Sequence, residues 1–172
     1  MNNGVPDGVS QAFAAHEAFE EREGAFAATT ARFDTRILVV DRDESASRYR
    51  LSLTVPTLSS AVEGPVADVV EEGWLDTFRL RLEDAAMAVP TDSGIEVPTA
   101  NVDNGDIVVE TTFRESDPER APRTAKALIN YVEGTYAEGV VPGYEYRPPV
   151  SDLLASARHD DSDTDPGGPM PL

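Results

Sequence analysis

The sequence predicts an α+β fold in which helices cover one face of an antiparallel sheet of four or five strands. Three observations support this two-layer sandwich. Residues 48–55 alternate apolar and polar side chains, as a half-buried strand does. Asn104-Gly105 has the composition of a tight hairpin turn. Residues 118–137 carry an apolar stripe at helical spacing, so the predicted order of elements is α-β-β-α-β-β-α.

The first predicted elements are a helix and a hairpin. The helix covers 10–23, because apolar residues recur at helical spacing and Gly24 follows as a stop. The hairpin joins strands at 33–40 and 48–55 through a short polar link. Residues 1–9 are rich in Gly, Pro and Asn, so we expect a flexible N-terminus there.

A long helical pattern fills the middle of the chain, over 57–89. Apolar side chains recur every four residues from Val66 to Leu82, and Pro90 ends the pattern. Gly73 marks a bend or a break between two helices. This segment therefore adds further helix to the layer that covers the sheet, and in the chain it lies between the two predicted hairpins.

The second hairpin is predicted at 95–114 and the last helix at 118–137. Together with the earlier elements they make one domain, over 10–155, a size typical of a single core. Residues 156–172 contain several aspartates followed by Pro and Gly, so we expect a disordered acidic tail.

The charge of the chain indicates its environment. Among 172 residues, 32 are acidic and 14 are basic, which gives a net charge of −18, and Lys126 is the single lysine. Such a surface repels itself in dilute salt, but at about 1 M salt the screening length falls to roughly 3 Å. We therefore expect a halophilic protein from a cell that keeps molar salt inside; the alternative is an ordinary acidic mesophilic protein.

Several partners and locations are disfavoured by composition. No apolar run reaches the roughly 18 residues that a membrane helix needs, and the start of the chain lacks signal-peptide features. We therefore expect a cytoplasmic protein. A net charge of −18 repels phosphate backbones and anionic lipids, so neither nucleic acid nor membrane is an expected partner.

Common catalytic motifs are missing from the sequence. It has no cysteine, no G-x-S-x-G elbow and no phosphate-binding loop, and its histidines are His16 and His159. The acidic run 161–165 begins like a calcium loop, but Pro166 occupies the position that needs glycine. We therefore expect no catalytic residue, no metal and no cofactor.

Aromatic residues form the first candidate site. Tyr136, Tyr144 and Tyr146 lie close together in the sequence, and Trp74 lies on the long helical pattern. Tyrosine combines apolar area with a hydroxyl, which suits pockets and interfaces. The alternative is that these rings pack the segment after the last helix onto the domain, as buried aromatics usually do.

Arginines form the second candidate site. If the first hairpin pairs as predicted, Arg36, Arg48 and Arg50 point away from the apolar face and form a basic patch. Such a patch suits an anion or an acidic partner, because the guanidinium binds carboxylates through two hydrogen bonds. The alternative is charge balance with Asp34 and neighbouring carboxylates.

Several short runs give the chain a family resemblance over roughly 10–157. It resembles a small protein family of halophilic archaea that has no assigned function, and the resemblance therefore implies no activity and no catalytic residues. The element order also resembles that of small α+β chaperone-like dimers, a likeness of fold alone. The runs that carry the family resemblance are Val55-Pro56-Thr57-Leu58, Glu72-Gly73-Trp74, Arg81-Leu82-Glu83-Asp84-Ala85, Val132-Glu133-Gly134-Thr135-Tyr136 and Pro142-Gly143-Tyr144-Glu145-Tyr146.

From these observations we predict a non-enzymatic binding or adaptor protein that binds a protein partner and forms a homodimer. The alternative is an enzyme or small-molecule binder with an unfamiliar site near Trp74 and 136–146. A concave site with converging polar groups would favour the alternative, and an open interaction surface would favour the binding protein.

Overall fold

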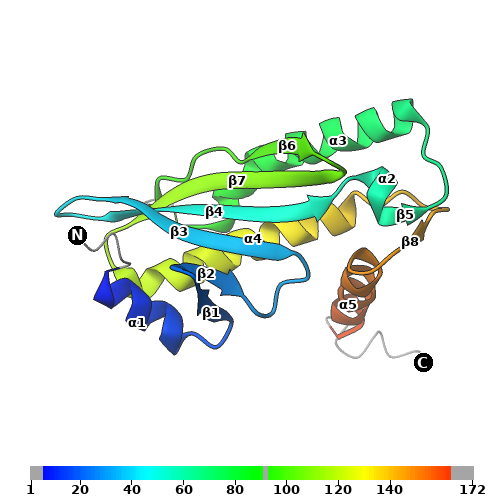
Figure 1. The fold of residues 1–172 in the computed structure, drawn as a ribbon. Helices are drawn as coiled ribbons and strands as arrows, with labels where there is room; N and C mark the ends of the chain where they lie inside the picture. The colour runs from blue at the N-terminus through cyan, green and yellow to red at the C-terminus, as the bar shows by residue number, and fades with distance from the viewer. Residues whose placement is uncertain (1–5, 91–92, 164–172) are drawn as a thin grey trace, which may run out of the picture.

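A computed structural model describes residues 6–90 and 93–163 and confirms the α+β fold class (Figure 1). Six antiparallel strands form the main sheet in the order β1-β2-β3-β4-β7-β6, and β5 pairs with β8 in a small separate sheet. The helices and strands are α1 (Asp7–Ala15), β1 (Phe19–Arg22), β2 (Ala25–Ala28), β3 (Asp34–Arg42), β4 (Ser47–Pro56), α2 (Leu58–Ala61), β5 (Val62–Glu63), α3 (Asp68–Leu82), β6 (Thr99–Asp103), β7 (Asp106–Glu115), α4 (Ala121–Glu138), β8 (Glu145–Tyr146) and α5 (Val150–Asp163).

Strand β4 is the centre of the sheet. It pairs with β7 from Ser47 to Pro56, along its whole length, and with β3 on its other side. Every second side chain of β4 is buried on the same face of the sheet. The register of both neighbours follows from this alternation, because a slip by one residue would turn the apolar set toward water.

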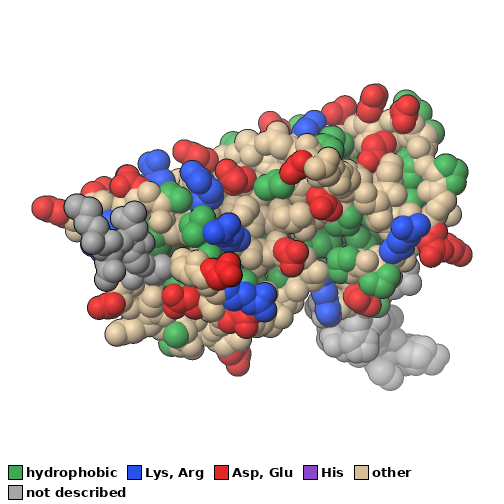
Figure 2. All heavy atoms as spheres, viewed as in Figure 1, with side chains coloured by type: hydrophobic (Ala, Val, Ile, Leu, Met, Phe, Trp, Pro, Cys, Tyr) green, Lys and Arg blue, Asp and Glu red, His purple; other side chains and the backbone are tan. Residues whose placement is uncertain are grey.

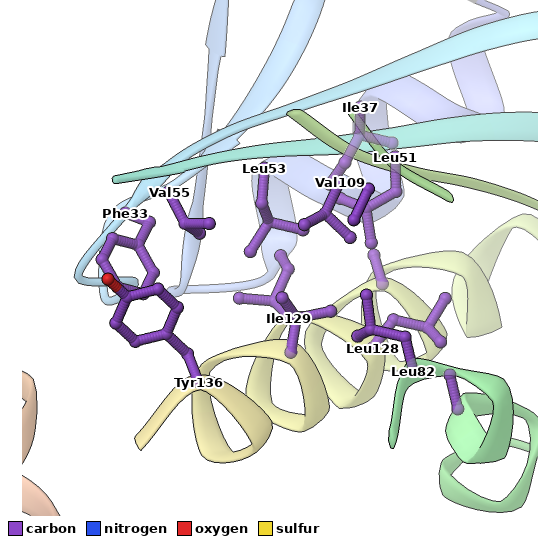
Figure 3. Packing of buried hydrophobic residues seen from close by; sticks show 14 of the residues in the cluster. Phe33, Ile37, Leu51, Leu53, Val55, Leu82, Val109, Leu128, Ile129 and Tyr136 are labelled. Atoms are coloured by element: carbon purple, nitrogen blue, oxygen red, sulfur yellow. The ribbon is translucent and has the colours of Figure 1, made fainter. Parts of the chain in front are cut away.

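Helix α4 covers the buried face of β4 (Figure 3). Its side chains Leu128 and Ile129 lie opposite Leu53 and Val109 of the sheet. Burial of each such side chain contributes about 1.5–3 kcal/mol. The core also takes side chains from α1 and α3, whereas the alternate side chains of the central strands point to the other face. That second face is exposed or half-buried, and we call it the open face.

The prediction of a helix over 10–23 is wrong for the second half of that range. Helix α1 ends at Ala15, and the following residues form the hairpin of β1 and β2. The turn at Glu23 and Gly24 has φ values of 51° and 79°, so Gly24 belongs to a hairpin turn and does not stop a helix. At its other end α1 includes 7–9, which were expected to be flexible, and Val9 is buried.

The long helix expected over 57–89 is divided into shorter pieces. The break lies at Gly64, which has a φ of 88°, and not at Gly73, which is inside α3. Before the break α2 is a single turn, and after α3 the chain continues as a 3₁₀ helix over Glu83–Ala88. The division lets β5 pair with β8, so the segment after α4 is tied to the domain by backbone hydrogen bonds.

We expected a disordered tail from residue 156 onward, but residue 156 lies inside α5, which extends from Val150 to Asp163. Val150 and Leu153 are buried, and α5 packs against α4. The structure therefore has a helix over 156–163, where we expected the start of a disordered tail. The remaining expected tail, 164–172, lies outside the described residues, as do 1–5 of the expected N-terminus.

Two hairpin turns with similar φ values allow a matched test. Asn104 and Gly105 have φ values of 50° and 84°, close to those of Glu23 and Gly24. A left-handed conformation costs an ordinary residue roughly 1–2 kcal/mol, and asparagine tolerates it better. We predict that Glu23→Asn raises the free energy of unfolding by about 0.5–1 kcal/mol and that Asn104→Glu lowers it by a similar amount. Chemical denaturation measures both; changes of the same sign would contradict the strain argument.

Candidate functional site: the open face of the sheet

Four arginines lie on the open face. The register places Arg48 opposite Arg114, with Arg50 two residues along β4, and Arg36 opposite Ser52. Residues opposite one another in antiparallel strands share a face, so all four point away from α4. We call Arg36, Arg48, Arg50 and Arg114 the Arg face. Figure 2 shows Lys and Arg side chains gathered over these strands among scattered acidic ones.

Charge balance accounts for two of these arginines. The guanidinium of Arg50 lies 3.7 Å from the carboxylate of Glu110, and that of Arg114 lies 2.8 Å from Asp43. Within residues 6–90 and 93–157, Arg36 and Arg48 have no carboxylate within ion-pair distance. The structure therefore leaves two cations on this face available to an anionic group.

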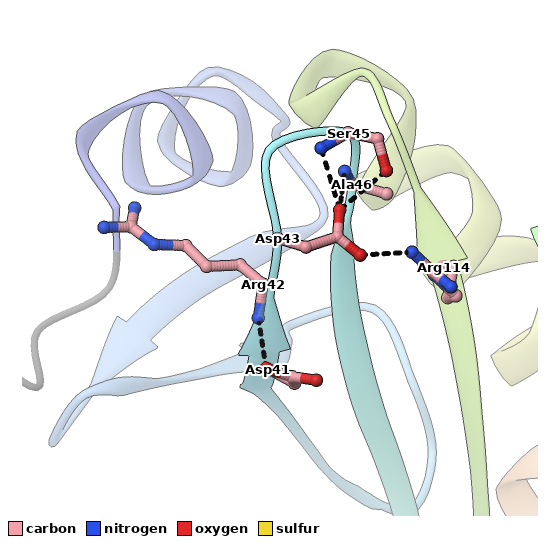
Figure 4. A network of polar contacts seen from close by, with 6 residues as sticks. All are labelled: Asp41, Arg42, Asp43, Ser45, Ala46 and Arg114. Carbon is pink, nitrogen blue, oxygen red and sulfur yellow. Dashed lines mark hydrogen bonds and ion pairs between the residues drawn. The ribbon is translucent and has the colours of Figure 1, made fainter.

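The turn between β3 and β4 holds one end of the Arg face in place (Figure 4). Oδ1 of Asp43 accepts hydrogen bonds from the backbone N–H groups of Ser45 and Ala46, at 2.8 and 2.9 Å, and from the Ser45 hydroxyl at 2.6 Å. These hydrogen bonds, led by the one from the Ser45 hydroxyl, and the nearby Arg114 lower the pKa of Asp43 to about 2. Asp43 therefore stays ionised, and its other oxygen orients Arg114.

The aromatic candidates Trp74 and Tyr136 lie in the core. Their rings meet edge to face with centroids 5.4 Å apart, and Phe33 and Phe78 pack against Tyr136 at 5.0 and 5.9 Å. The Tyr136 hydroxyl donates to the carbonyl oxygen of Pro56 at 2.9 Å, which satisfies its polar atom. Burial raises the pKa of Tyr136, so its hydroxyl remains protonated and serves packing.

Tyr144 and Tyr146 are half-buried and pack against the edge of the core. The Tyr146 hydroxyl accepts from the backbone N–H of Val141 at 2.7 Å and donates to its carbonyl at 3.1 Å. Tyr146 also sits opposite Val62 in the small sheet. These contacts support the packing interpretation, in which the rings hold the segment after α4 on the domain.

A concave feature lies between α1 and the start of α4. It has a volume of about 610 Å³, and its lining includes Ala12, His16, Pro122 and Arg123. Nδ1 of His16 accepts from the backbone N–H of Ala18 at 3.2 Å, a local bond that ends α1. The hollow is separate from Trp74 and the tyrosines, so it does not provide the site that the alternative function placed there.

Two carboxylates that sequence analysis did not single out are buried, and each accepts hydrogen bonds from another part of the fold. Oε1 of Glu133 accepts from the backbone N–H groups of Arg32 and Phe33, at 2.6 and 3.4 Å, and burial raises its pKa. Glu115 accepts from the Thr124 hydroxyl at 2.7 Å. Both carboxylates join α4 to the loops and strands it covers, so we assign them to stability.

Arg114 is the residue of the Arg face that sequence reasoning missed. Residues 107–114 alternate apolar and polar side chains, and Arg114 is on the polar side, but its neighbours depend on how β7 pairs with β4. Among the described residues, no group of three or more His, Asp or Glu side chains is arranged to hold a metal ion. None of the helices in those ranges combines the length and apolar character needed to cross a membrane.

The fold and this surface define a class: an α+β protein with one covered and one open sheet face, and without a recognised catalytic motif in its sequence. The model of a family described as "Family of unknown function (DUF5813)" matches residues 14–156, so the chain belongs to that family. This confirms the expected membership in a family without an assigned function. Neither a curated protein nor a solved structure matches the chain.

The two half-buried tyrosines provide a test of the packing interpretation. Tyr146→Phe removes both hydrogen bonds to Val141 and leaves the ring in place. We predict a loss of about 1 kcal/mol in the free energy of unfolding. Tyr144→Phe is the matched control and leaves stability unchanged, whereas Tyr144→Ala, which deletes the packed ring, costs at least about 1 kcal/mol. Equal stability of Tyr146→Phe and the parent would show that the hydroxyl does not hold this segment.

Proposed function

We propose that the protein is a non-enzymatic binding protein that uses the Arg face to hold an acidic segment of a protein partner. The observation that carries this proposal is the pair of arginines, Arg36 and Arg48, that lack a carboxylate partner among the described residues of a chain with a charge of −18. A guanidinium forms two parallel hydrogen bonds with a carboxylate, which gives directional contact even where salt screens long-range attraction.

The spacing of the Arg face fits a polypeptide. Arg48 and Arg50 are two residues apart on one strand, which separates them by roughly 7 Å. Alternate side chains of an extended peptide have the same separation. The open face of β3, β4 and β7 carries no aromatic ring on which a base could stack, because the rings of these strands point into the core. A protein partner is therefore favoured over single-stranded nucleic acid.

A partner could also bind by adding a strand to a free edge of the sheet, but the edge formed by β6 is partly blocked. The Arg79 side chain of α3 donates two hydrogen bonds to the carbonyl oxygen of Ala100 on β6, at 2.9 and 2.8 Å. A covered carbonyl is unavailable to an added strand. This supports binding across the open face in preference to strand addition at β6.

We further propose that the protein works in a cytoplasm with molar salt and that a second copy of the chain can be the acidic partner, which would make a homodimer. Support comes from the charge of −18 with Lys126 as the single lysine, since dense carboxylates keep a surface hydrated at high salt. The enzyme alternative near Trp74 loses support because Trp74 and Tyr136 are packed in the core.

The acidic-partner proposal is tested with charge-neutral variants. The double variant Arg36→Gln/Arg48→Gln removes the two arginines without an ion-pair partner. We expect it to lower the affinity for a fluorescent poly-glutamate peptide at least tenfold, as measured by anisotropy in salt that maintains the fold. Arg147→Gln, at an exposed position after β8, is the control and keeps the parent affinity.

Other results would overturn that proposal. Equal loss in the double variant and in Arg147→Gln would mean that only net charge matters. Tighter binding of single-stranded DNA than of the peptide would assign the Arg face to nucleic acid. Light scattering on the free protein identifies a homodimer by its mass, and a dimer that the double variant dissociates would identify the second copy as the partner.

Salt dependence tests the proposed environment. We predict that lowering KCl from molar to tens of millimolar markedly lowers the melting temperature, because repulsion within the −18 charge is no longer screened. Circular dichroism during thermal unfolding measures this in one buffer at several salt concentrations. A melting temperature that is constant across the range would rule out dependence on high salt.

A further inference from the structure

A polar hollow of about 480 Å³ opens on the sheet between the β1–β2 hairpin and the strands β3 and β4. Its origin lies in the pairing, because β2 and β3 share the single register pair Phe26 and Ile37. These two side chains point into the core, so the neighbours of Phe26 turn the other way: Ala27 is half-buried on the open face, and Ala25 is buried but still lines the hollow. Their small size leaves a depression beside the larger side chains of β3.

Short polar side chains and charges line this hollow. Ser52 and Thr54 contribute hydroxyls from β4, opposite Arg36 and Asp34 of β3. Arg36 and Asp34 are two residues apart on the same face, so a cation and an anion lie side by side at the rim. Neither forms an ion pair within the part of the chain that the structure describes, and both are exposed.

The β1–β2 hairpin adds Arg22 and Glu23 to the lining. Arg22 is paired with Glu20 of its own strand, which leaves Arg36 as the cation of this hollow that has no carboxylate within ion-pair distance among the described residues. A ligand with a single negative charge would meet the repulsion of Asp34 and Glu23, and one with a single positive charge would meet that of Arg36. A ligand that carries both charges satisfies both sides.

We propose that this hollow binds a small zwitterion of the α-amino acid class, with its carboxylate on Arg36 and its ammonium on Asp34. The hydroxyls of Ser52 and Thr54 complete the polar lining, and the volume lies within the roughly 300–1,000 Å³ range of small-molecule sites. The site is distinct from the contact with an acidic partner, although Arg36 belongs to both, and it gives the protein a second ligand of another kind.

The test uses the full chain and measures binding by NMR titration with four probes: glycine, L-alanine, acetate and methylammonium. We expect the two amino acids to shift the amide signals of Ala27 and Ser52 and to bind at least tenfold more tightly than either single-charge probe. Asp34→Asn should remove the preference of glycine over acetate, and Arg36→Gln the preference of glycine over methylammonium. Equal binding of glycine and acetate to the parent would overturn the proposal.

Ala27→Leu separates this inference from the proposed function, because it fills the hollow without changing any charge. It should lose glycine binding and keep binding to poly-glutamate, whereas Arg48→Gln/Arg50→Gln should do the reverse. The amide spectrum of each variant checks that it is folded, and Arg114→Gln, at the far end of the open face, is the control that keeps glycine binding. Glycine binding that survives in folded Ala27→Leu would place the ligand elsewhere.

Discussion

The alternation of side chains along β4 is the constraint on which the rest of the structure depends. Its inward residues, from Tyr49 to Val55, are buried beneath α4, and pairing with β3 and β7 imposes the same in-out pattern on both neighbours. The outward residues between them are then necessarily on one surface. The same alternation therefore determines both the core and the candidate site, because a register that buries Leu51 also exposes Arg50.

The second constraint is the cost of burying charge in a chain with 32 carboxylates. The buried carboxylates Glu115 and Glu133 each accept hydrogen bonds, and both connect α4 to other parts of the fold. The other acidic side chains of residues 6–90 and 93–157 remain half-buried or exposed, which keeps the surface strongly negative. Against this background a small group of arginines on an uncovered sheet face is chemically distinct.

Sequence patterns predicted the features that depend on local periodicity. The alternation of 48–55 and the Asn104-Gly105 turn gave the central strands, and the stripe of 118–137 gave α4. They failed where two patterns overlap: apolar spacing before Gly24 resembles a helix, but the chain turns into a hairpin. Likewise the outward direction of three arginines followed from one hairpin, whereas the place of Arg114 and the hollow beside Arg36 depend on how distant strands pair, which spacing does not encode.

The central claim is that one face of the sheet is open and the other is covered. The chain has no cysteine, so single cysteines report on each face without interference. Ser52→Cys lies on the open face, and Thr111→Cys is a nearly isosteric change at a buried position of β7. Thiol labelling of the monomer under native conditions, at protein concentrations too low for dimers to form, should be fast for the first and strongly slowed for the second. Equal protection of both cysteines would contradict the account, because it would show that the Arg face is already covered in the free protein.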